Sequence, residues 1–369
     1  MKPRVTIVLP TYNSMPFLER CLSSLQQLDY AAYDVLVVDD CSSDNTVTYI
    51  RQNYPQVRVI ALPARSGHSA ACNAGISGTD ARYVYIVEHH TVVMPDTLQR
   101  LMGAILAEAE AAICYSRQIN IYDAHTVAVE GKRFAHYVVN QQCERELHER
   151  VDAEKFAAEH CLTQSGDPVD VTSAGTFSYL IDTEKFTDIG LFDEDYFIHI
   201  NDYELTLRVK AAGWKCLYVP TAVHYHKSFV TTTGTHNFRG GDCYPGFRTF
   251  VISRNRWLLM LSYYSIKSFC ILAPALLLYE CLLIGFVTRR GVLGSYLKAI
   301  GWLLSHPGSI LRKRQAIQRI KIVRDRDLLV AGDLNFVPGL THSPFERRLI
   351  HGLTRFLSSY WEWGKQFLA

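Results

Sequence analysis

A buried strand that ends in two carboxylates constrains the fold of this chain more than any other feature. The segment Val35–Val38 is apolar, and Asp39 and Asp40 follow it directly. A first strand, Val5–Leu9, and an amphipathic helix, Met15–Leu28, come before it. A strand, a helix and a strand of this length predict a right-handed crossover in a parallel sheet. Ligands of such sheets bind beyond the carboxyl ends of the strands, where the two aspartates suit hydroxyls, a nucleobase N–H or a metal ion. A solvated turn is the alternative interpretation of this segment.

The same alternation continues to about residue 115 and predicts a doubly wound α/β domain. Further strands are expected over residues 57–62 and 83–87, and further helices over 69–77 and 95–108. Residues 116–170 are less regular, and one polar helix is expected there, from about Gln141 to Cys161. Strand-like sequence returns at Val171, and the domain is expected to close near Phe250.

Composition excludes several classes of protein. With 369 residues and 48% hydrophobic residues, the chain can bury one large domain and an appendage. A net charge of +2 argues against nucleic-acid binding. The ten cysteines are scattered without a C-x-x-C pair, which indicates reduced cytosolic thiols rather than disulfides or a zinc site. No signal peptide precedes the first strand, so the domain is expected on the cytosolic side.

The tail, in contrast, predicts membrane attachment. Trp257–Val287 is almost wholly apolar and contains a stretch long enough to span a bilayer, although Glu280 interrupts it. Arg289 follows as a cytosolic anchor would, and the next apolar stretch, Val292–Leu304, is too short to cross. The basic run Arg312–Arg314 suits anionic headgroups. We expect one span or an in-plane helical hairpin; a buried helix pair is the alternative.

Several short motifs occur in a fixed order along the first two thirds of the chain. They are Val8–Asn13, Val37–Thr46, a G-x-x-x-A-x-N-x-G helix at Gly67–Gly75, Pro95–Leu98 and the segment 190–208 with Gly213–Trp214. In this order and spacing they resemble glycosyltransferase family 2, which has the GT-A fold, over residues 4–257. No G-x-G-x-x-G follows the first strand, so a Rossmann dehydrogenase is disfavoured.

The resemblance implies a domain organisation and a donor site. It implies a GT-A domain, α/β with a mostly parallel sheet flanked by helices, over residues 1–256. A helical, membrane-associated region would follow over residues 257–369. A sugar nucleotide would lie across the strand ends, with Asp39 accepting hydrogen bonds from the nucleoside and Asp40 supporting the turn. The nucleotide-sugar-binding residues implied in this way are Pro10, Thr11, Asn13, Asp39, Asp40 and Asn73.

The metal motif of the family is D-x-D, and this sequence departs from it with Glu88-His89-His90. Glu88 still offers the hard oxygen that a divalent ion prefers, and an imidazole from His90 suits Mn²⁺ better than Mg²⁺. His226 matches a family position that faces the metal or the phosphates. The expected cofactor is therefore a divalent cation, Mn²⁺ before Mg²⁺. Alternatively, His89 and His90 only end a strand and metal binding is weakened or lost.

The segment 190–208 resembles the family's G-x-F-D-E-x-F…E-D-x-D-L-x-x-R element. Asp202 falls on the catalytic base, and Asn201 replaces the usual Glu. A carboxylate can take the proton of an acceptor hydroxyl as that oxygen attacks the anomeric carbon. Glu204 is expected to orient the helix start or to pair with Arg208. The alternative for Asp202 is a helix cap.

Three further segments have assigned roles. Arg256, in Arg254–Trp257, fits a leaving diphosphate through bidentate hydrogen bonds or serves as a juxtamembrane anchor. Thr231–Tyr244 is expected to form a lid over the donor, and Thr172–Thr176 aligns with a loop near the acceptor.

These features together predict an inverting, metal-dependent glycosyltransferase that is associated with a membrane, its catalytic domain in the cytoplasm as at a bacterial inner membrane. Its partners would be a nucleotide-sugar donor and a lipid-linked or polysaccharide acceptor, without nucleic acid. A catalytically silent sugar-nucleotide-binding or scaffold protein is one alternative, motivated by the departures at Glu88-His89-His90 and Asn201. A nucleotidyltransferase is another, but it would need a basic triphosphate loop, and none lies between Pro10 and Pro16.

Overall fold

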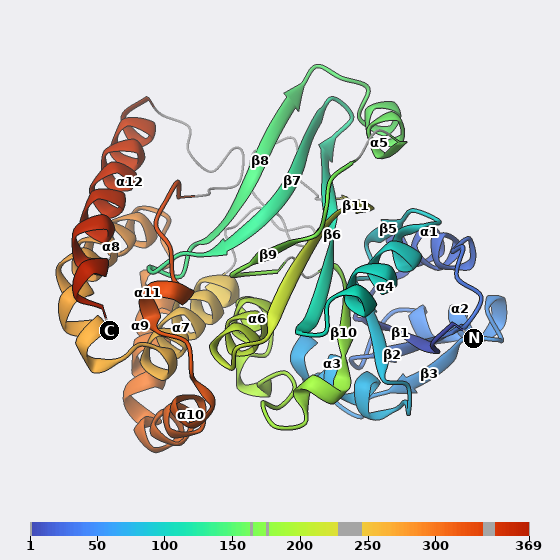
Figure 1. The fold of residues 1–369 in the computed structure, drawn as a ribbon. Coiled ribbons are helices and arrows are strands. Elements are labelled where there is room, and N and C mark those ends of the chain that lie inside the picture. The colour runs from blue at the N-terminus through green and yellow to red at the C-terminus, as the bar shows by residue number, and fades with distance from the viewer. Residues whose placement is uncertain (1, 163–164, 175–176, 228–245, 335–343, 369) are drawn as a thin grey trace. The chain divides into compact units, whose positions relative to one another are not determined.

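The computed structural model describes residues 2–162, 165–174, 177–227, 246–334 and 344–368 (Figure 1). The chain divides into two compact units, which are considered one at a time. The first takes the described residues of 1–133, 144–209 and 214–228, and the second takes those of 134–143, 210–213 and 229–369. The expected loops Thr231–Tyr244 and, in part, Thr172–Thr176 lie outside the described residues.

The first unit is built on a mixed sheet with the strand order β3-β2-β1-β4-β10-β6-β11-β5 (Figure 1). Its parallel half consists of β3 (Arg58–Ala61), β2 (Tyr33–Asp39), β1 (Val5–Thr11) and β4 (Tyr83–Val87). In the other half, β10 (Ser178–Asp182) runs antiparallel between β4 and β6 (Ala111–Asp123), and β11 (Lys215–Lys227) runs parallel to β6. Two short strands, β5 (Thr91–Val93) and β9 (Val169–Val171), pair with β11. The predicted α/β sheet flanked by helices is confirmed.

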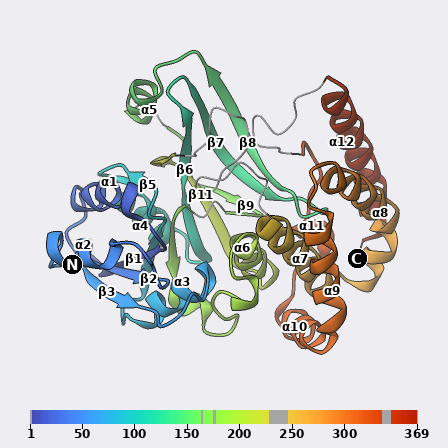
Figure 2. The same cartoon turned by 180° about the vertical axis from the view of Figure 1, so that it is seen from behind.

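Helices on both faces bury this sheet (Figure 2). They are α1 (Met15–Gln26), α2 (Thr46–Asn53), α3 (His68–Ser77) and α4 (Thr97–Ala107). The amphipathic spacing predicted for α1 is realised, because Leu18, Leu22 and Leu25 are fully buried. α3 packs close to β1 at Gly75, where an added Cβ would lie 2.3 Å from a methyl group of Val8. The strand order reverses between β1 and β4, so the crevice at their carboxyl ends is the expected ligand site.

The prediction for residues 116–170 was largely wrong. The expected helix from Gln141 to Cys161 is a strand, β8 (Gln141–Glu149), which pairs with β7 (Thr126–Ala135), and only α5 (Ala153–Leu162) is helical. The charged sequence of β8 suggests a solvated helix, but its charged side chains form ion pairs with side chains of the neighbouring strand β7. Arg145 pairs with Glu130 at 2.8 Å and Glu144 with Lys132 at 3.4 Å. These partners are distant in sequence, so the local pattern could not reveal them.

The segment that leads to α6 (Asn201–Ala211) has a strained backbone. After the short 3₁₀ turns η1 (Thr183–Phe186) and η2 (Glu194–Tyr196), the residues Phe197, His199 and Ile200 have φ of 59°, 62° and 62°. This left-handed conformation is uncommon outside glycine and an outlier for a β-branched residue such as Ile200. Such strain tends to be kept where the surrounding structure and the function require it.

The second unit contains the C-terminal helices. They are α7 (Gly246–Tyr263), α8 (Ile266–Arg289), α9 (Leu293–Ser305), α10 (Pro307–Ile320), α11 (Asp325–Leu328) and α12 (Pro344–Gly364), followed by the turn η3 (Lys365–Phe367). α7 runs without a break through residue 256, where the sequence predicted a domain boundary, and that boundary stays a prediction. Within the described part of the chain, α8 alone is long and apolar enough to cross a membrane, and 28% of its apolar stretch is buried.

Charged residues inside the second unit are paired with one another. Glu280 of α8 accepts hydrogen bonds from Arg256, from the Trp257 indole at 3.1 Å and from the Tyr296 hydroxyl at 2.5 Å. The acidic residue that interrupts the apolar stretch therefore joins α8 to α7 and α9.

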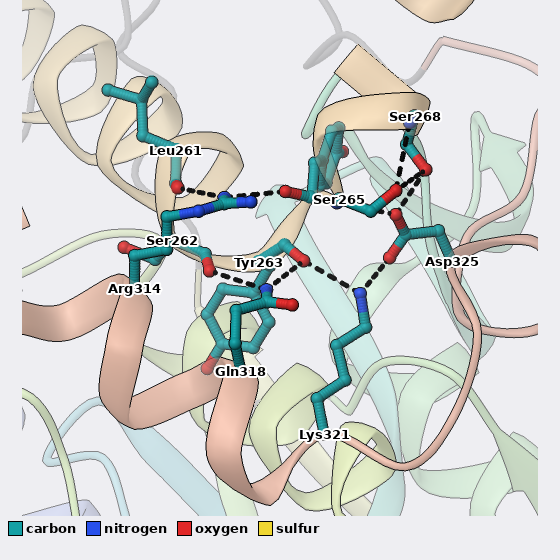
Figure 3. A network of polar contacts seen from close by, with 10 residues as sticks. Leu261, Ser262, Tyr263, Ser265, Ser268, Arg314, Gln318, Lys321 and Asp325 are labelled. Carbon is teal, nitrogen blue, oxygen red and sulfur yellow. Dashed lines mark hydrogen bonds and ion pairs between the residues drawn. The ribbon is translucent and has the colours of Figure 1, made fainter. Parts of the chain in front are cut away.

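Helix α10 satisfies the carbonyl groups at the end of α7 (Figure 3). Arg314 Nη1 donates to Leu261 O and Tyr264 O at 2.8 and 2.7 Å, and Gln318 Nε2 donates to Ser262 O and Tyr263 O. The carbonyls of the last helical turn have no partner within their own helix, and cations are favourable at this end. Of the basic run predicted to face lipid headgroups, Arg314 therefore has a different role.

Candidate functional site

The carboxyl ends of β1 and β2 meet in one polar loop cluster. Asp39 is buried and accepts hydrogen bonds from the Ser42 backbone N–H at 2.9 Å and from the Thr11 hydroxyl at 3.3 Å. Asn13, with φ of 49°, donates its backbone N–H to Ser42 Oγ at 2.8 Å. Three of the predicted donor-binding residues are thus brought together around one turn.

Asp40 holds the turn that opens α3. Its two carboxylate oxygens accept hydrogen bonds from the backbone N–H groups of Ser66 at 2.6 Å and Gly67 at 2.9 Å. Gly67 has φ of +92°, and a Cβ there would lie 2.5 Å from the Phe197 ring, so only glycine fits. Both oxygens of Asp40 therefore stabilise the turn before α3, and its role in nucleotide-sugar binding stays a prediction.

Asn73 connects α3 to the segment before the predicted base. Its Nδ2 donates to Phe192 O and to Glu194 Oε1, each at 2.9 Å, and its Oδ1 accepts from Phe192 N at 3.0 Å. Both ends of the side chain are engaged by protein atoms. The nucleotide contact implied for Asn73 stays a prediction.

Glu88 follows β4 and forms a partly buried ion pair with His68 of α3. Burial by itself raises the pKa of Glu88, but the charge and hydrogen bond of His68 outweigh it and hold this pKa below its usual value. Burial acts in the opposite direction on His68, whose pKa is nevertheless raised well above its usual value by Cys72 and Glu88. Nδ1 of His68 lies 2.8 Å from the side-chain amide of Asn201. One imidazole therefore joins the predicted metal loop to the start of the base helix.

His90 and His226 face each other at the neighbouring strand ends. Their Nε2 atoms are 3.4 Å apart, and their rings are perpendicular with centroids 4.6 Å apart. The Phe177 ring lies against both, and the His89 ring stacks on His90. His89 itself donates from Nδ1 to Pro10 O at 3.3 Å, so it ties β4 to β1.

A chain of hydrogen bonds fixes which nitrogen of His226 carries the proton. The Arg133 guanidinium can only donate, and it donates to Gln118 Oε1 at 3.1 Å. Gln118 Nε2 then donates to Asn120 Oδ1 at 2.8 Å, and that oxygen lies 2.6 Å from His226 Nδ1. Because the oxygen only accepts, Nδ1 of His226 carries the proton and Nε2 presents its lone pair toward His90.

His226 is neutral near pH 7. Burial lowers its pKa to about 4, although Glu130 and Glu88 act in the opposite direction. A neutral imidazole with a fixed Nδ1–H is the form in which histidine binds metal ions. Among the described residues, no group of three or more His, Cys, Asp or Glu side chains could hold a metal ion. The residues present therefore fit an ion held by two imidazoles, with further ligands supplied from outside the protein.

Asp202 is the second residue of α6 and is partly exposed. The start of α6 is held in place by buried Arg208. This side chain pairs with Glu204 at 2.7 Å and donates to Ile189 O and Gly190 O at 3.0 Å. The predicted pairing of Glu204 with Arg208 is confirmed. Burial raises the pKa of Tyr179 well above its usual value, and the nearby charges of Glu88 and Asp202 act in the same direction. The base role of Asp202 stays a prediction.

Arg256 belongs to the second unit, where it is buried and donates to Glu280. Its guanidinium also lies 4.9 Å from the Tyr279 ring centre. The predicted contact with a leaving diphosphate stays a prediction.

Sequence reasoning missed several residues of this cluster. His68 could have been noticed, since it directly follows Gly67 in a recognised motif. Gln118, Asn120 and Arg133 gave no such signal, because they belong to the β6–β7 hairpin that the sequence pattern predicted as irregular.

Comparison with known proteins identifies relatives of this chain. Residues 6–158 match the family described as "Glycosyl transferase family 2". The succinoglycan biosynthesis protein ExoO of Rhizobium meliloti is 33% identical over 131 residues, which are 35% of this chain and 36% of that protein. An N-acetylglucosaminyl-diphospho-decaprenol L-rhamnosyltransferase of Mycobacterium tuberculosis is 29% identical over 238 residues, which are 61% of this chain and 76% of the relative.

A solved structure supports the fold. GalNAc-T7, crystallised with UDP, GalNAc and Mn²⁺, matches with a TM-score of 0.56 and 14% identity. The match covers 82% of this chain and 58% of the other. At this identity the likeness concerns the fold alone, and it agrees with the predicted GT-A architecture.

Proposed function

The chain belongs to glycosyltransferase family 2, and on this premise we propose that it transfers a sugar from a nucleotide-sugar donor to an acceptor hydroxyl with inversion at the anomeric carbon. The observation that carries the proposal is the convergence of Asp39, the His90–His226 pair and the Asp202 helix start in the first unit. His68 supports that arrangement by contacting both Glu88 and Asn201.

The donor is proposed to bind across the ends of β1 and β2. Asp39 accepts hydrogen bonds from the nucleoside, beside Thr11 and Asn13, and charged acceptors make such bonds strong. Pro10 and Asp40 keep the two loops in place, since Pro10 O accepts from His89 and Asp40 binds the turn before α3. Asn73 is assigned to positioning the segment before Asp202.

Asp202 is proposed as the general base. It takes the proton of the acceptor hydroxyl while the hydroxyl oxygen forms a bond to the anomeric carbon and the bond to the diphosphate breaks. An amide at Asn201 leaves one negative charge fewer beside this carboxylate than a glutamate would.

His90 and His226 are proposed to hold a divalent cation, Mn²⁺ in preference to Mg²⁺, with further ligands supplied from outside the protein; Glu88, which the sequence suggested as a third ligand, is paired with His68 instead. Imidazole nitrogen suits Mn²⁺ better than Mg²⁺, which prefers oxygen ligands. When bound, the ion supplies positive charge that stabilises the leaving diphosphate. Asn120 keeps the Nε2 lone pair of His226 directed toward that position.

The acceptor is proposed to be a lipid-linked or polysaccharide glycan at the cytosolic face of a membrane. The named activities of the relatives support this, since one acts in succinoglycan biosynthesis and the other on a decaprenol-linked sugar. The exposed apolar surface of α8 in the second unit supports attachment to that membrane.

The test is turnover of a panel of nucleotide sugars by the purified full chain, with Mn²⁺, with Mg²⁺ and with a chelator. We expect one donor to be consumed, more rapidly with Mn²⁺, and Asp202→Asn to lower the rate by about 10² to 10⁴ with donor affinity within a few-fold. Asp188→Asn, which removes the charge of an exposed carboxylate earlier in the chain, is the control for charge alone. If no donor binds or reacts, or if Asp202→Asn keeps full activity, the proposal is rejected; donor binding without turnover would favour the catalytically silent alternative.

A further inference from the structure

Helix α12 is anchored in the second unit by one of its faces. The Trp361 ring stacks on the Tyr137 ring with centroids 5.3 Å apart, and the Tyr137 hydroxyl donates to Leu357 O at 3.0 Å. The Tyr360 hydroxyl donates to Ile271 O of α8 at 2.7 Å, and the two helices lie side by side (Figures 1 and 2). The orientation of α12 within its unit is therefore fixed.

A second face of α12 exposes a row of large apolar side chains. Its members are Phe345, Leu349, Phe356, Trp363 and, in η3, Phe367, and they are 42–70% exposed. Their spacing of four and seven residues places them on one side of a helix. Phe356, Tyr360, Trp363 and Phe367 contact each other in succession, with ring centroids 5.3–5.7 Å apart. We call the exposed residues Phe345, Leu349, Phe356, Trp363 and Phe367 the aromatic stripe.

Basic residues border the aromatic stripe. Arg348 and Arg355 each directly precede a member of the stripe, and both are exposed, as is Arg347. The two acidic residues of the helix are already paired, Glu346 with Arg289 at 3.6 Å and Glu362 with Lys365 at 2.6 Å. The charge left beside the aromatic rings is therefore positive.

We propose that α12 lies flat in the headgroup region of an anionic phospholipid bilayer, with the aromatic stripe inserted and Arg348 and Arg355 at the phosphates. Aromatic rings prefer this depth of the bilayer, and cationic side chains add attraction to anionic lipid. Four charged positions within its first twelve residues, Glu346, Arg347, Arg348 and Arg355, exclude a bilayer-spanning role for α12. The inference rests on the proposed function, since it names the surface by which the enzyme meets a membrane-bound acceptor.

The test measures binding of the full chain to phosphatidylcholine vesicles with and without phosphatidylglycerol, by co-sedimentation. The wild type is expected to bind the anionic vesicles. Phe345→Ser/Phe356→Ser/Trp363→Ser should weaken that binding by about tenfold for each ring removed. Arg348→Gln/Arg355→Gln should weaken binding to the anionic vesicles only. Leu106→Ser, which removes an equally exposed apolar side chain from α4, should bind as the wild type does.

A conservative variant guards against misfolding of the triple variant. In vesicles that contain dibrominated phosphatidylcholine, the fluorescence of Trp363 should be quenched. Trp363→Phe keeps an aromatic ring and should bind normally, but it should lose the part of the quenched fluorescence that comes from Trp363. Equal quenching in wild type and Trp363→Phe, or unchanged binding of the triple variant, would overturn the proposal, as would failure of the wild type to bind anionic vesicles. Donor turnover in detergent, without vesicles, is measured on the same samples. If the wild type binds anionic vesicles but turns over no donor, the result counts against the proposed function and not against this inference.

Discussion

At the scale of single residues, the chemistry of the candidate site depends on side chains that do not touch the proposed substrate. The oxygen of Asn120 holds the proton of His226 on Nδ1, and it can do so only because Gln118 and Arg133 fix the orientation of the amide. Partners of this kind set the orientation and basicity of a metal-binding imidazole. His226 is therefore held in one tautomer by a set of hydrogen bonds that begins at Arg133.

Replacement of Asn120 by Leu should weaken Mn²⁺ binding about 10- to 100-fold, because His226 loses the acceptor that fixes its tautomer. Isothermal titration of the purified chain with Mn²⁺, without donor, measures this directly. Asn120→Asp keeps an acceptor oxygen at the same place and should retain most of the affinity. Equal Mn²⁺ affinity in the wild type and Asn120→Leu would show that this oxygen does not control His226.

At the scale of elements, the C-terminal helices are joined through their ends as well as through their apolar faces. Side chains of α10 bind the terminal carbonyls of α7, and Asp325 of α11 accepts a hydrogen bond from the Ser265 backbone N–H, at the start of α8, at 2.9 Å (Figure 3). Lys321, in the link between α10 and α11, pairs with Asp325. The bend between α7 and α8 is therefore fixed by polar contacts from two other helices.

Arg314→Met should lower the free energy of unfolding by about 1.5–3 kcal/mol, since it removes charged hydrogen bonds to two carbonyl groups that then lack a partner. Arg312→Met, two positions earlier on the same helix and exposed, is the matched control and should change it by less than about 0.5 kcal/mol. Denaturant unfolding of both variants measures the difference. Similar losses in the two variants would mean that Arg314 acts only through its charge.

At the scale of the whole molecule, the chain passes back and forth between its two units. Residues 134–143, which comprise the end of β7, the turn and the start of β8, belong to the second unit although the rest of the hairpin belongs to the first. His136 in this turn is fully buried, and its Nδ1 accepts a hydrogen bond from the Val138 N–H at 3.1 Å. Burial lowers the pKa of His136 to about 3. The native second unit therefore holds this imidazole neutral.

This low pKa predicts a loss of stability in acid. Between pH 6.5, the ordinary pKa of histidine, and pH 3, the unfolded chain binds a proton at residue 136 that the native unit does not. The contribution is therefore complete above pH 6.5 and is lost as the pH falls toward 3, by at most about 5 kcal/mol. His136→Asn keeps an acceptor for Val138 and should flatten the dependence of unfolding free energy on pH across this window. The same slope in both proteins would contradict the prediction.

The sequence by itself determined the parallel half of the sheet, the helices that cover it and the loops that carry Asp39, Glu88 and Asp202. Apolar periodicity and short motifs act over a few residues, so they can be recognised in one chain. The pairing of Glu204 with Arg208 was predictable for the same reason, since residues four apart share a helix face.

Only the tertiary structure decided the pairing of β8, the partner of Glu88, the tautomer of His226 and the use of Arg314. Each of these depends on a group that lies far away in the sequence. A charged side chain binds the partner that folding brings within reach, and the local sequence around it contains no information about which partner that is.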